Sequence, residues 1–511
     1  MGKADDEFVR NCGRLSESAI LWVSARPEPE PKGTLVTGSI ALIVLLVTAV
    51  AFAIFGIAVA RGRIFSVEDF ISARRSTGPG VVSLSLIASS LGAWVLFSPA
   101  EAAARTGVVA LAGYAIGSAL AIAIFAWLGP RMRRLLPDGH AITEFVLHRY
   151  GKAMYAFVLI ATVAYMFLYL AAEMTAIGSA VTVVTGIDRA VTVFAVTTAT
   201  LVYTVYGGLR SSLNTDVPQA IIIIVLLLVL PAFFIVHLGG LAAVSSALNA
   251  KQPELLSTVA WPGWETALAL ILAIVGANLF NQGYWQRVWV TRSDADLRRA
   301  FLWAGLVNVP ALMLAGSFGL IAQAAGVLSE PSAALFDLVG AVASPVIGLV
   351  VLVLAVALVM SSVDTLLSAL VSLFAIDAAR LNPGLTGARL LSISRWLTVV
   401  PAVLAGIIGL QGYSVLYLFL LADLICVAAA VPTFYGLYES RLSGRTAIAA
   451  AVLGLIAGGY FFPNPTFESG SLFLSFVVAA AVPAVICFSF GRSGTAFAFE
   501  SLQRRVRALG S

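Results

Sequence analysis

Long runs of apolar residues, separated by short polar segments, fill most of the chain. A membrane-spanning helix needs about 20 mostly apolar residues, and such runs recur from residue 37 to residue 491. The pattern predicts about 13 transmembrane helices. Their expected spans are residues 37–60, 79–104, 106–130, 153–184, 188–206, 215–237, 265–289, 299–326, 344–378, 390–411, 413–437, 446–462 and 471–491.

The composition agrees with a chain that folds in lipid. Hydrophobic residues make up 60% of the 511 positions and charged residues only 11%, whereas a soluble domain carries about 25% charged residues. Three cysteines and three histidines are too dispersed for a disulfide framework or a metal cluster. The expected fold class is therefore an all-α polytopic membrane protein, with the lipid bilayer as a partner.

The positions of Lys and Arg predict how the chain is oriented. Cytoplasmic loops of membrane proteins carry an excess of these residues. Most of them fall in loops after the odd-numbered expected helices, including Arg287, while loops after even-numbered helices contain only Arg105, Arg189 and Lys251. We expect a multi-pass protein of the cell (inner or plasma) membrane, with the N-terminus outside and the C-terminus cytoplasmic. Because the net charge of +5 is explained in this way, no nucleic acid partner is expected.

Three regions are expected along the chain. Residues 1–36 are polar and are interpreted as a weakly structured tail. Residues 37–491 form the transmembrane domain, and residues 492–511 form a basic cytoplasmic tail. The sequence contains no Gly-rich loop of the kind that binds nucleotide phosphates. We therefore expect an ion-driven secondary transporter and not an enzyme, with an uncoupled sensor or channel as an alternative.

Two of the expected helices look breakable. Residues 83–92 are rich in small and hydroxyl residues, and residues 276–283 contain two glycines and three side-chain amides. Small residues also simply permit close helix packing. In many transporters, however, paired broken helices form the binding site near the middle of the bilayer. The two segments begin two five-helix blocks, residues 79–237 and 265–437, and an odd number of helices inverts the second block relative to the first.

Polar side chains inside the apolar runs suggest ion binding. The ninth expected helix contains adjacent hydroxyls, Ser361 and Ser362. Sodium can share backbone carbonyls with such hydroxyls, although serine in a membrane helix also bonds back to its own helix. Ionisable residues inside membrane helices are costly and usually functional, and a proton-coupled carrier using Asp364 or Glu173 is a second hypothesis. Such residues within the expected spans include Glu101, which can pair with Arg105, Glu173, Asp364 and Asp423.

Four segments resemble signature segments of the sodium/solute symporter family. They are residues 281–300, beginning NQGYWQR, residues 206–219, close to the pattern YGGL…TD..Q, residues 360–368 and residues 144–151. The resemblance covers roughly residues 37–490. It implies an inverted-repeat core of five plus five helices (LeuT-like), in agreement with the two blocks, and a sodium-coupled symporter that imports a small polar organic solute by alternating access.

The resemblance also implies a sodium site, with Na+ as the co-transported ion. Asp216 matches a family aspartate on the cytoplasmic sodium route, to which we also assign Asp364. A second interpretation of Asp216 is a carboxylate at a helix N-terminus, where the helix dipole stabilises negative charge. The implied sodium ligands are the backbone carbonyls of Ala88, Leu91 and Leu358 and the hydroxyls of Ser361 and Ser362.

The substrate would lie beside the two breaks. Gly283 and Val95 stand where sugar carriers of the family have Tyr and Gln, which argues against a sugar, and Ser90 stands where proline carriers have Asp. The solute class stays open among proline or other amino acids, urea, monocarboxylates and vitamins. The substrate-binding candidates are Ser89, Ser90, Trp94, Asn278, Asn281, Gln282, Tyr284 and Asp423.

Overall fold

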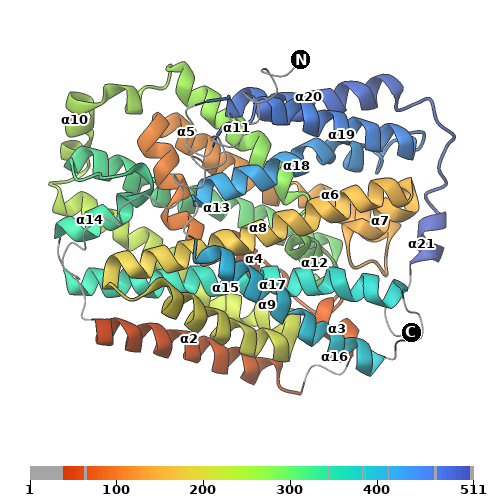
Figure 1. The fold of residues 1–511 in the computed structure, drawn as a ribbon, viewed down its shortest axis with the longest axis horizontal. Coiled ribbons are helices and arrows are strands. Elements are labelled where there is room, and N and C mark those ends of the chain that lie inside the picture. The colour runs from red at the N-terminus through yellow and green to blue at the C-terminus, as the bar shows by residue number, and fades with distance from the viewer. Residues whose placement is uncertain are drawn as a thin grey trace, which may run out of the picture. The chain divides into compact units, whose positions relative to one another are not determined.

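The computed structural model describes residues 38–506, apart from 63–65, 343, 382–384, 386, 412–413 and 465–468. The expected polar tail, residues 1–36, lies outside the described residues. Helices dominate (Figure 1), with one isolated parallel bridge between Thr77 and Thr291. The helices are α2 (Gly38–Ala60), α3 (Val67–Ile71), α4 (Pro79–Ser90), η1 (Ala93–Leu96), α5 (Ser98–Ala123), α6 (Phe125–Leu135), α7 (Ile142–Tyr150), α8 (Lys152–Thr185), α9 (Arg189–His237), α10 (Leu241–Lys251), η2 (Pro253–Leu256), α11 (Trp261–Asn278), α12 (Gln282–Val290), α13 (Asp294–Ala325), η3 (Pro331–Ala333), α14 (Ala334–Val342), α15 (Pro345–Leu381), α16 (Gly387–Leu397), α17 (Val399–Gly409), α18 (Val415–Tyr435), α19 (Gly444–Tyr460), α20 (Leu472–Phe490) and α21 (Ser501–Arg505).

The second expected helix is broken, as its small and hydroxyl residues predict. α4 ends at Ser90, and Leu91 takes the non-helical angles φ −104° and ψ 89°. The short 3-10 helix η1 follows, and α5 begins only at Ser98. Because the regular hydrogen-bond ladder stops here, backbone oxygens at the break become available for other partners.

The seventh expected helix is broken as well. α11 and α12 are bent by 57° relative to each other at a break between Asn278 and Gln282. The Asn281 side chain accepts a hydrogen bond from the backbone N–H of Tyr284 at 3.4 Å and so caps α12. Both interruptions predicted from the sequence are therefore present.

The count of 13 spans is not confirmed. Nine helices in the described part of the chain are long and apolar enough to cross a membrane, or ten if α11 and α12 form one span. One reason is that α9 runs through two expected spans: its 49 residues correspond to about 73 Å, far more than the bilayer core of about 30 Å. Gly208 inside α9 has φ 51° and ψ −140°, and a side chain there would overlap the Phe70 carbonyl. The kink divides α9 into two segments, each of roughly membrane length.

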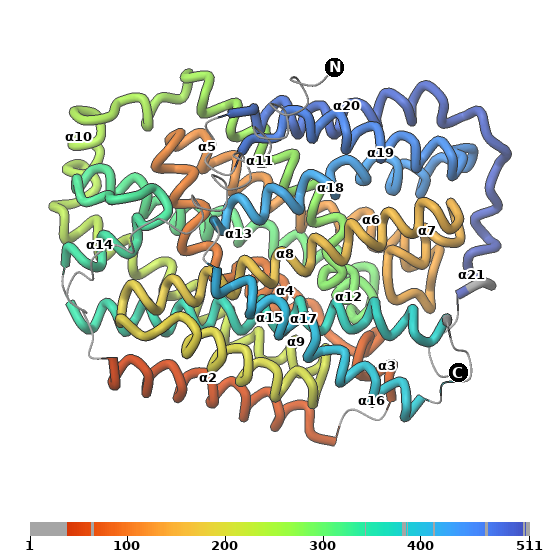
Figure 2. The backbone as a smooth tube through the Cα atoms, in the orientation of Figure 1, coloured from red at the N-terminus to blue at the C-terminus, as the bar shows by residue number. Residues whose placement is uncertain are grey.

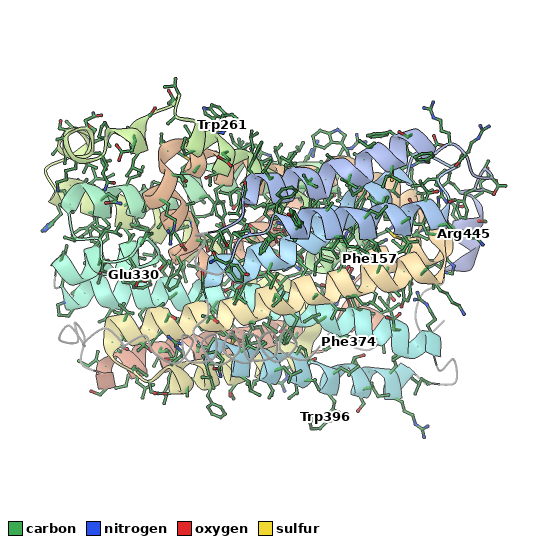
Figure 3. The ribbon with its side chains drawn as sticks, turned by 45° about the horizontal axis from the view of Figure 1, so that its top comes forward. Phe157, Trp261, Glu330, Phe374, Trp396 and Arg445 are labelled. Carbon is green, nitrogen blue, oxygen red and sulfur yellow. The ribbon has the colours of Figure 1, made fainter. Side chains whose placement is uncertain are left out.

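Large apolar side chains remain exposed on the outer helices. Trp261 is 59% exposed and Trp396 is 74% exposed, and Figure 3 shows both at the periphery. Exposed apolar surface on this scale, on helices of membrane-spanning length, is matched by lipid and not by water. The protein is therefore embedded in a membrane.

The long helix α15 brings the two broken segments together. It packs against α4, η1, α8, α9 and α12, and Figure 2 shows α4 and α12 close to it. The stretch of α15 from Val351 to Ser372 is buried throughout except for Val353's partial exposure. Residues on this stretch are therefore placed to complete any site that forms at the breaks.

Candidate functional site

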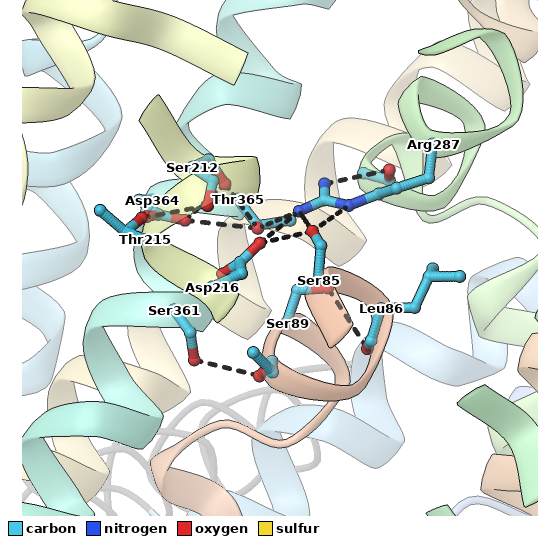
Figure 4. Close-up of polar contacts among 12 residues, drawn as sticks. Ser85, Leu86, Ser89, Ser212, Thr215, Asp216, Arg287, Ser361, Asp364 and Thr365 are labelled. Atoms are coloured by element: carbon cyan, nitrogen blue, oxygen red, sulfur yellow. Dashed lines mark hydrogen bonds and ion pairs between the residues drawn. The ribbon is translucent and has the colours of Figure 1, made fainter. Parts of the chain in front are cut away.

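The predicted sodium ligands lie together at the contact between α4 and α15. Ser361 Oγ donates to the Ala88 carbonyl at 3.0 Å, across the interface, and to the Leu358 carbonyl at 2.9 Å. Ser362 Oγ donates to the same Leu358 carbonyl at 3.1 Å. All four residues are fully buried. Figure 4 shows Ser361 directed at α4. The serines thus bond to their own helix and also meet the broken one.

The chemistry of this donor set fits a hard monovalent cation. Ala88 and Leu358 offer carbonyl oxygens, and Ser361 and Ser362 offer hydroxyl oxygens. The carbonyl of Leu91, at the break itself, accepts no hydrogen bond from the described residues. Unwound carbonyls together with hydroxyls are the ligands that sodium uses in transporters with broken helices. We refer to these five residues as the oxygen cradle; their role in ion binding remains a prediction.

A small, partly open pocket with a cavity volume of about 40 Å³ lies beside the oxygen cradle. Trp94 Nε1 donates to Tyr169 Oη at 2.9 Å, and Tyr165 Oη donates to Asn278 Oδ1 at 3.2 Å. Of the described residues that line it, Asp423 alone carries a formal charge. The lining residues are Ser90, Trp94, Tyr114, Ser118, Tyr165, Tyr169, Ile274, Asn278, Tyr284, Phe419 and Asp423.

Five of the eight substrate candidates line this pocket: Ser90, Trp94, Asn278, Tyr284 and Asp423. The other three lie outside its lining. Ser89 Oγ is 3.5 Å from the Leu86 carbonyl, Asn281 caps α12, and Gln282 Nε2 donates to the His140 carbonyl at 2.6 Å. The sequence analysis did not single out Tyr114, Tyr165, Tyr169 or Phe419, since aromatic residues in apolar runs give no signal of their own.

A buried ionic network adjoins the oxygen cradle (Figure 4). Arg287 of α12 donates to Asp216 Oδ2 at 3.0 Å, to Ser85 Oγ at 2.9 Å and to Thr365 Oγ1 at 2.8 Å. These acceptors lie on α9, α4 and α15, so one guanidinium links the broken segment α12 to three other helices. The sequence analysis counts Arg287 among the loop charges that set the orientation of the chain. This interpretation is wrong, because the Arg287 side chain is 0% exposed.

Asp364 lies on the other side of this network. Its Oδ1 accepts from Ser212 Oγ at 2.8 Å, and its Oδ2 accepts from Tyr203 Oη at 2.8 Å and Thr215 Oγ1 at 3.1 Å. The carboxylate is thus surrounded by hydroxyls, and Thr365 connects it to Arg287. The place of Asp216 and Asp364 on a sodium route stays a prediction.

A second polar cluster joins α3, the segment between α6 and α7, and α7, outside the membrane-spanning segments. His140 Nε2 is 2.7 Å from Glu68 Oε2 and its Nδ1 is 3.6 Å from Glu144 Oε2. Arg74 binds Glu68 at 2.7 Å and approaches His140 Nε2 at 3.1 Å. Burial lowers the pKa of His140, but hydrogen bonds and charges from Glu144 and Glu68 outweigh it and raise the pKa to about 9. Burial raises the pKa of Glu68, but His140 and Arg74 lower it to about 2.

Replacing His140 is expected to remove stability in a pH-dependent way. Because its pKa rises from 6.5 to about 9 on folding, the charged imidazole stabilises the fold fully below about pH 6.5, and the effect is lost as the pH rises through about 9. The shift corresponds to on the order of 3 kcal/mol. Melting temperatures of His140→Gln and the unchanged protein should therefore differ most at pH 6 and converge by pH 10. His237→Gln, at an exposed position, is the control; a constant difference across this range would contradict the assignment.

Broken helices, an oxygen cradle and an adjoining polar pocket in an all-helical membrane fold define a solute transporter and not an enzyme. The fold is similar to that of a Na+-coupled sialic acid symporter solved in a substrate-bound outward-open state, with a TM-score of 0.72, 15% identity, and coverage of 89% of this chain and 98% of that one. The structure is thus a LeuT-like fold.

The chain belongs to the sodium:solute symporter family, whose sequence model matches residues 70–454. It is 28% identical to the spermidine transporter DUR31 of Candida albicans, over 80% of this chain and 78% of that protein. It is 25% identical to the osmoregulated proline transporter OpuE of Bacillus subtilis, over 76% and 82%. It is 24% identical to the urea-proton symporter DUR3 of Oryza sativa subsp. japonica, over 76% of this chain but only 60% of that protein.

Proposed function

We propose that this protein is a sodium-coupled symporter that imports a small amine-bearing solute by alternating access. It would act in the cell membrane, with the orientation that the Lys and Arg residues predict. The transport domain would comprise residues 37–491, between the tails 1–36 and 492–511. Its partners would be the solute, the lipid bilayer and Na+.

One observation carries the proposal: a single helix break serves both the oxygen cradle and the pocket. Ala88, on one side of the break, meets Ser361 of the cradle at 3.0 Å. Ser90 and Trp94, a few residues further on, line the pocket. A cation held between α4 and α15 would fix the position of the break and hence the shape of the pocket. Solute binding and ion binding would therefore favour the same conformation.

The lining of the pocket favours a solute with a positively charged nitrogen. Asp423 is 5% exposed and, among the described residues, has no ion-pair partner. Trp94 stacks on Tyr114 with ring centroids 5.6 Å apart, and Phe419 approaches Tyr169 at 4.7 Å. A carboxylate and several aromatic faces together bind ammonium groups through charge and cation–π attraction. The similarity to a spermidine transporter is consistent with this class.

Sodium coupling is tested by removing the two hydroxyls. We expect Ser361→Ala and Ser362→Ala to raise the sodium concentration for half-maximal uptake about tenfold each, since each loses an oxygen ligand. Uptake into proteoliposomes is measured over a sodium series, with choline as the replacing cation and fixed pH. Ser372→Ala, a buried α15 hydroxyl outside the cradle that accepts from Gln282, is the control.

Other outcomes of the same assay would favour the other hypotheses. Uptake that persists in choline buffer and follows the pH gradient would indicate proton coupling, as the name of the rice relative suggests. Solute that never accumulates above its outside concentration would indicate an uncoupled channel or sensor. A thermal-shift screen with spermidine, proline, urea, monocarboxylates and vitamins, each with and without sodium, would identify the solute class.

A further inference from the structure

Glu173 is a buried carboxylate to which the pocket and the oxygen cradle assign no role. It lies on α8 four residues after Tyr169 and eight after Tyr165, both of which line the pocket. This spacing places the three side chains on one face of the helix. α8 packs against η1 and α15, so this face is turned toward the break after α4. The side chain of Glu173 is 0% exposed.

The two carboxylate oxygens of Glu173 have different surroundings. Oε2 accepts a hydrogen bond from the backbone N–H of Ala93 at 2.7 Å, at the beginning of η1. Oε1 is buried and has no hydrogen-bond partner in the described part of the chain. It lies against Gly92, where even a methyl group would overlap it. The side chain of Ser362, a member of the oxygen cradle, lies beside the same carboxyl group.

The charge of this carboxylate is not balanced by a side chain. No Arg, Lys or His of the described residues forms an ion pair with Glu173. An uncompensated carboxylate inside a membrane is costly, and such groups usually face a partner charge or an ion pathway. A cation in the cradle next to Ser362 would supply the missing charge and the missing partner of Oε1.

We propose that Glu173 is the charged member of the cation site, and that its free oxygen Oε1 binds the co-transported cation together with the oxygen cradle. The inference rests on the proposed function. The cradle alone consists of neutral oxygens, so a cation there would carry a full uncompensated charge. With Glu173 the pair of charges is neutral while it is bound. Because Glu173 also holds η1 through Ala93, the cation would couple α8, α15 and the break in one contact.

The test removes the negative charge of Glu173 and keeps the shape of its side chain. Glu173→Gln retains a carbonyl oxygen that can accept from the Ala93 N–H but removes the negative charge. We expect the sodium concentration that half-maximally raises the melting temperature of the purified protein to increase about 10- to 100-fold, as for loss of a charge-assisted contact. In sodium-free buffer the variant should be at least as stable as the unchanged protein, because an unbalanced buried charge has been removed.

Glu101→Gln is the matched control, since Glu101 is another buried membrane carboxylate but pairs with Arg105 at 3.0 Å. It should leave the sodium midpoint within about twofold. An unchanged midpoint in Glu173→Gln, with Ser361→Ala shifted, would overturn the inference and leave the proposed function standing. An unchanged midpoint in Ser361→Ala, or no stabilisation of the unchanged protein by sodium, would overturn the proposed function itself.

A second variant covers the case in which Glu173→Gln does not fold. Glu173→Asp keeps the charge and withdraws it by one methylene group. If Oε1 binds the cation, the ratio of lithium to sodium midpoints should change at least threefold, since the two ions demand different ligand distances. An unchanged ratio together with an unchanged sodium midpoint would restrict Glu173 to holding η1 and would refute the inference.

Discussion

Replacing Arg287 with methionine is expected to abolish the folded transporter. The guanidinium is completely buried and bonds to Asp216, Ser85 and Thr365. Without it, the Asp216 carboxylate stays buried with no opposite charge beside it. Removing one partner of a buried ion pair costs about 3–5 kcal/mol, a large part of the 5–15 kcal/mol by which proteins are stable. Size-exclusion profiles of detergent extracts should show loss of the monodisperse peak.

Two further variants make this result specific. Arg292→Met removes an arginine whose side chain is 61% exposed and whose partner Asp296 is 3.8 Å away, so the peak should remain. The double change Arg287→Gln with Asp216→Asn removes both charges of the buried pair and should recover part of the stability lost in Arg287→Gln alone. A normal peak and melting temperature for Arg287→Met would show that the network does not hold the helices together.

Replacing Asp423 with asparagine is expected to eliminate transport of amine solutes while the protein remains folded. If an ammonium group pairs with this carboxylate in the pocket, its loss costs about 2–5 kcal/mol of binding, or roughly a 30-fold or greater fall in uptake efficiency. Stability should not fall, because Asp423 has no ion-pair partner among the described residues. Uptake of labelled spermidine and thermal shifts with spermidine, measured side by side, separate binding from later steps.

The control for this experiment is Asp188→Asn. Asp188 caps α9 at an exposed position, and asparagine caps a helix equally well, so uptake should be unchanged. Asp423→Glu keeps the charge in the pocket and should retain part of the transport. Equal uptake of spermidine by Asp423→Asn and the unchanged protein would refute an amine solute and leave the sodium site untouched.

The breaks in the fold could be predicted because their causes are local. Residues 83–92 and 276–283 contain residues that leave helices easily or compete for backbone bonds, and the structure interrupts both segments. The long apolar runs also predicted the membrane environment. The count of 13 spans is not confirmed, although the sequence divides α9 into the expected spans 188–206 and 215–237, on either side of the kink at Gly208.

The contacts between distant segments could not be predicted in the same way. Arg287 and Asp216 are 71 positions apart, and each had an adequate local interpretation as a loop charge and a helix-end carboxylate. They meet because α4 and α15 each pack against both α12, which carries Arg287, and α9, which carries Asp216. Opposite charges within apolar segments were the one available signal, because each would need a partner inside the membrane. Likewise, the sequence could not predict that one oxygen of Glu173 binds the Ala93 N–H while the other has no partner among the described residues, because this depends on where η1 packs.

The segment from Ala88 to Trp94 contributes to both proposed sites, since Ala88 and Leu91 belong to the oxygen cradle and Ser90 and Trp94 line the pocket. Thermodynamic reciprocity requires that the factor by which the ion improves solute affinity equals the factor by which the solute improves ion affinity. On the side of the membrane where the sodium concentration is low, loss of sodium from the cradle would lower the affinity for the solute, so that the solute would dissociate without a separate release signal. When the solute is absent, the sodium affinity of the cradle would in turn be lower, so that transporters without solute would carry little sodium across the membrane.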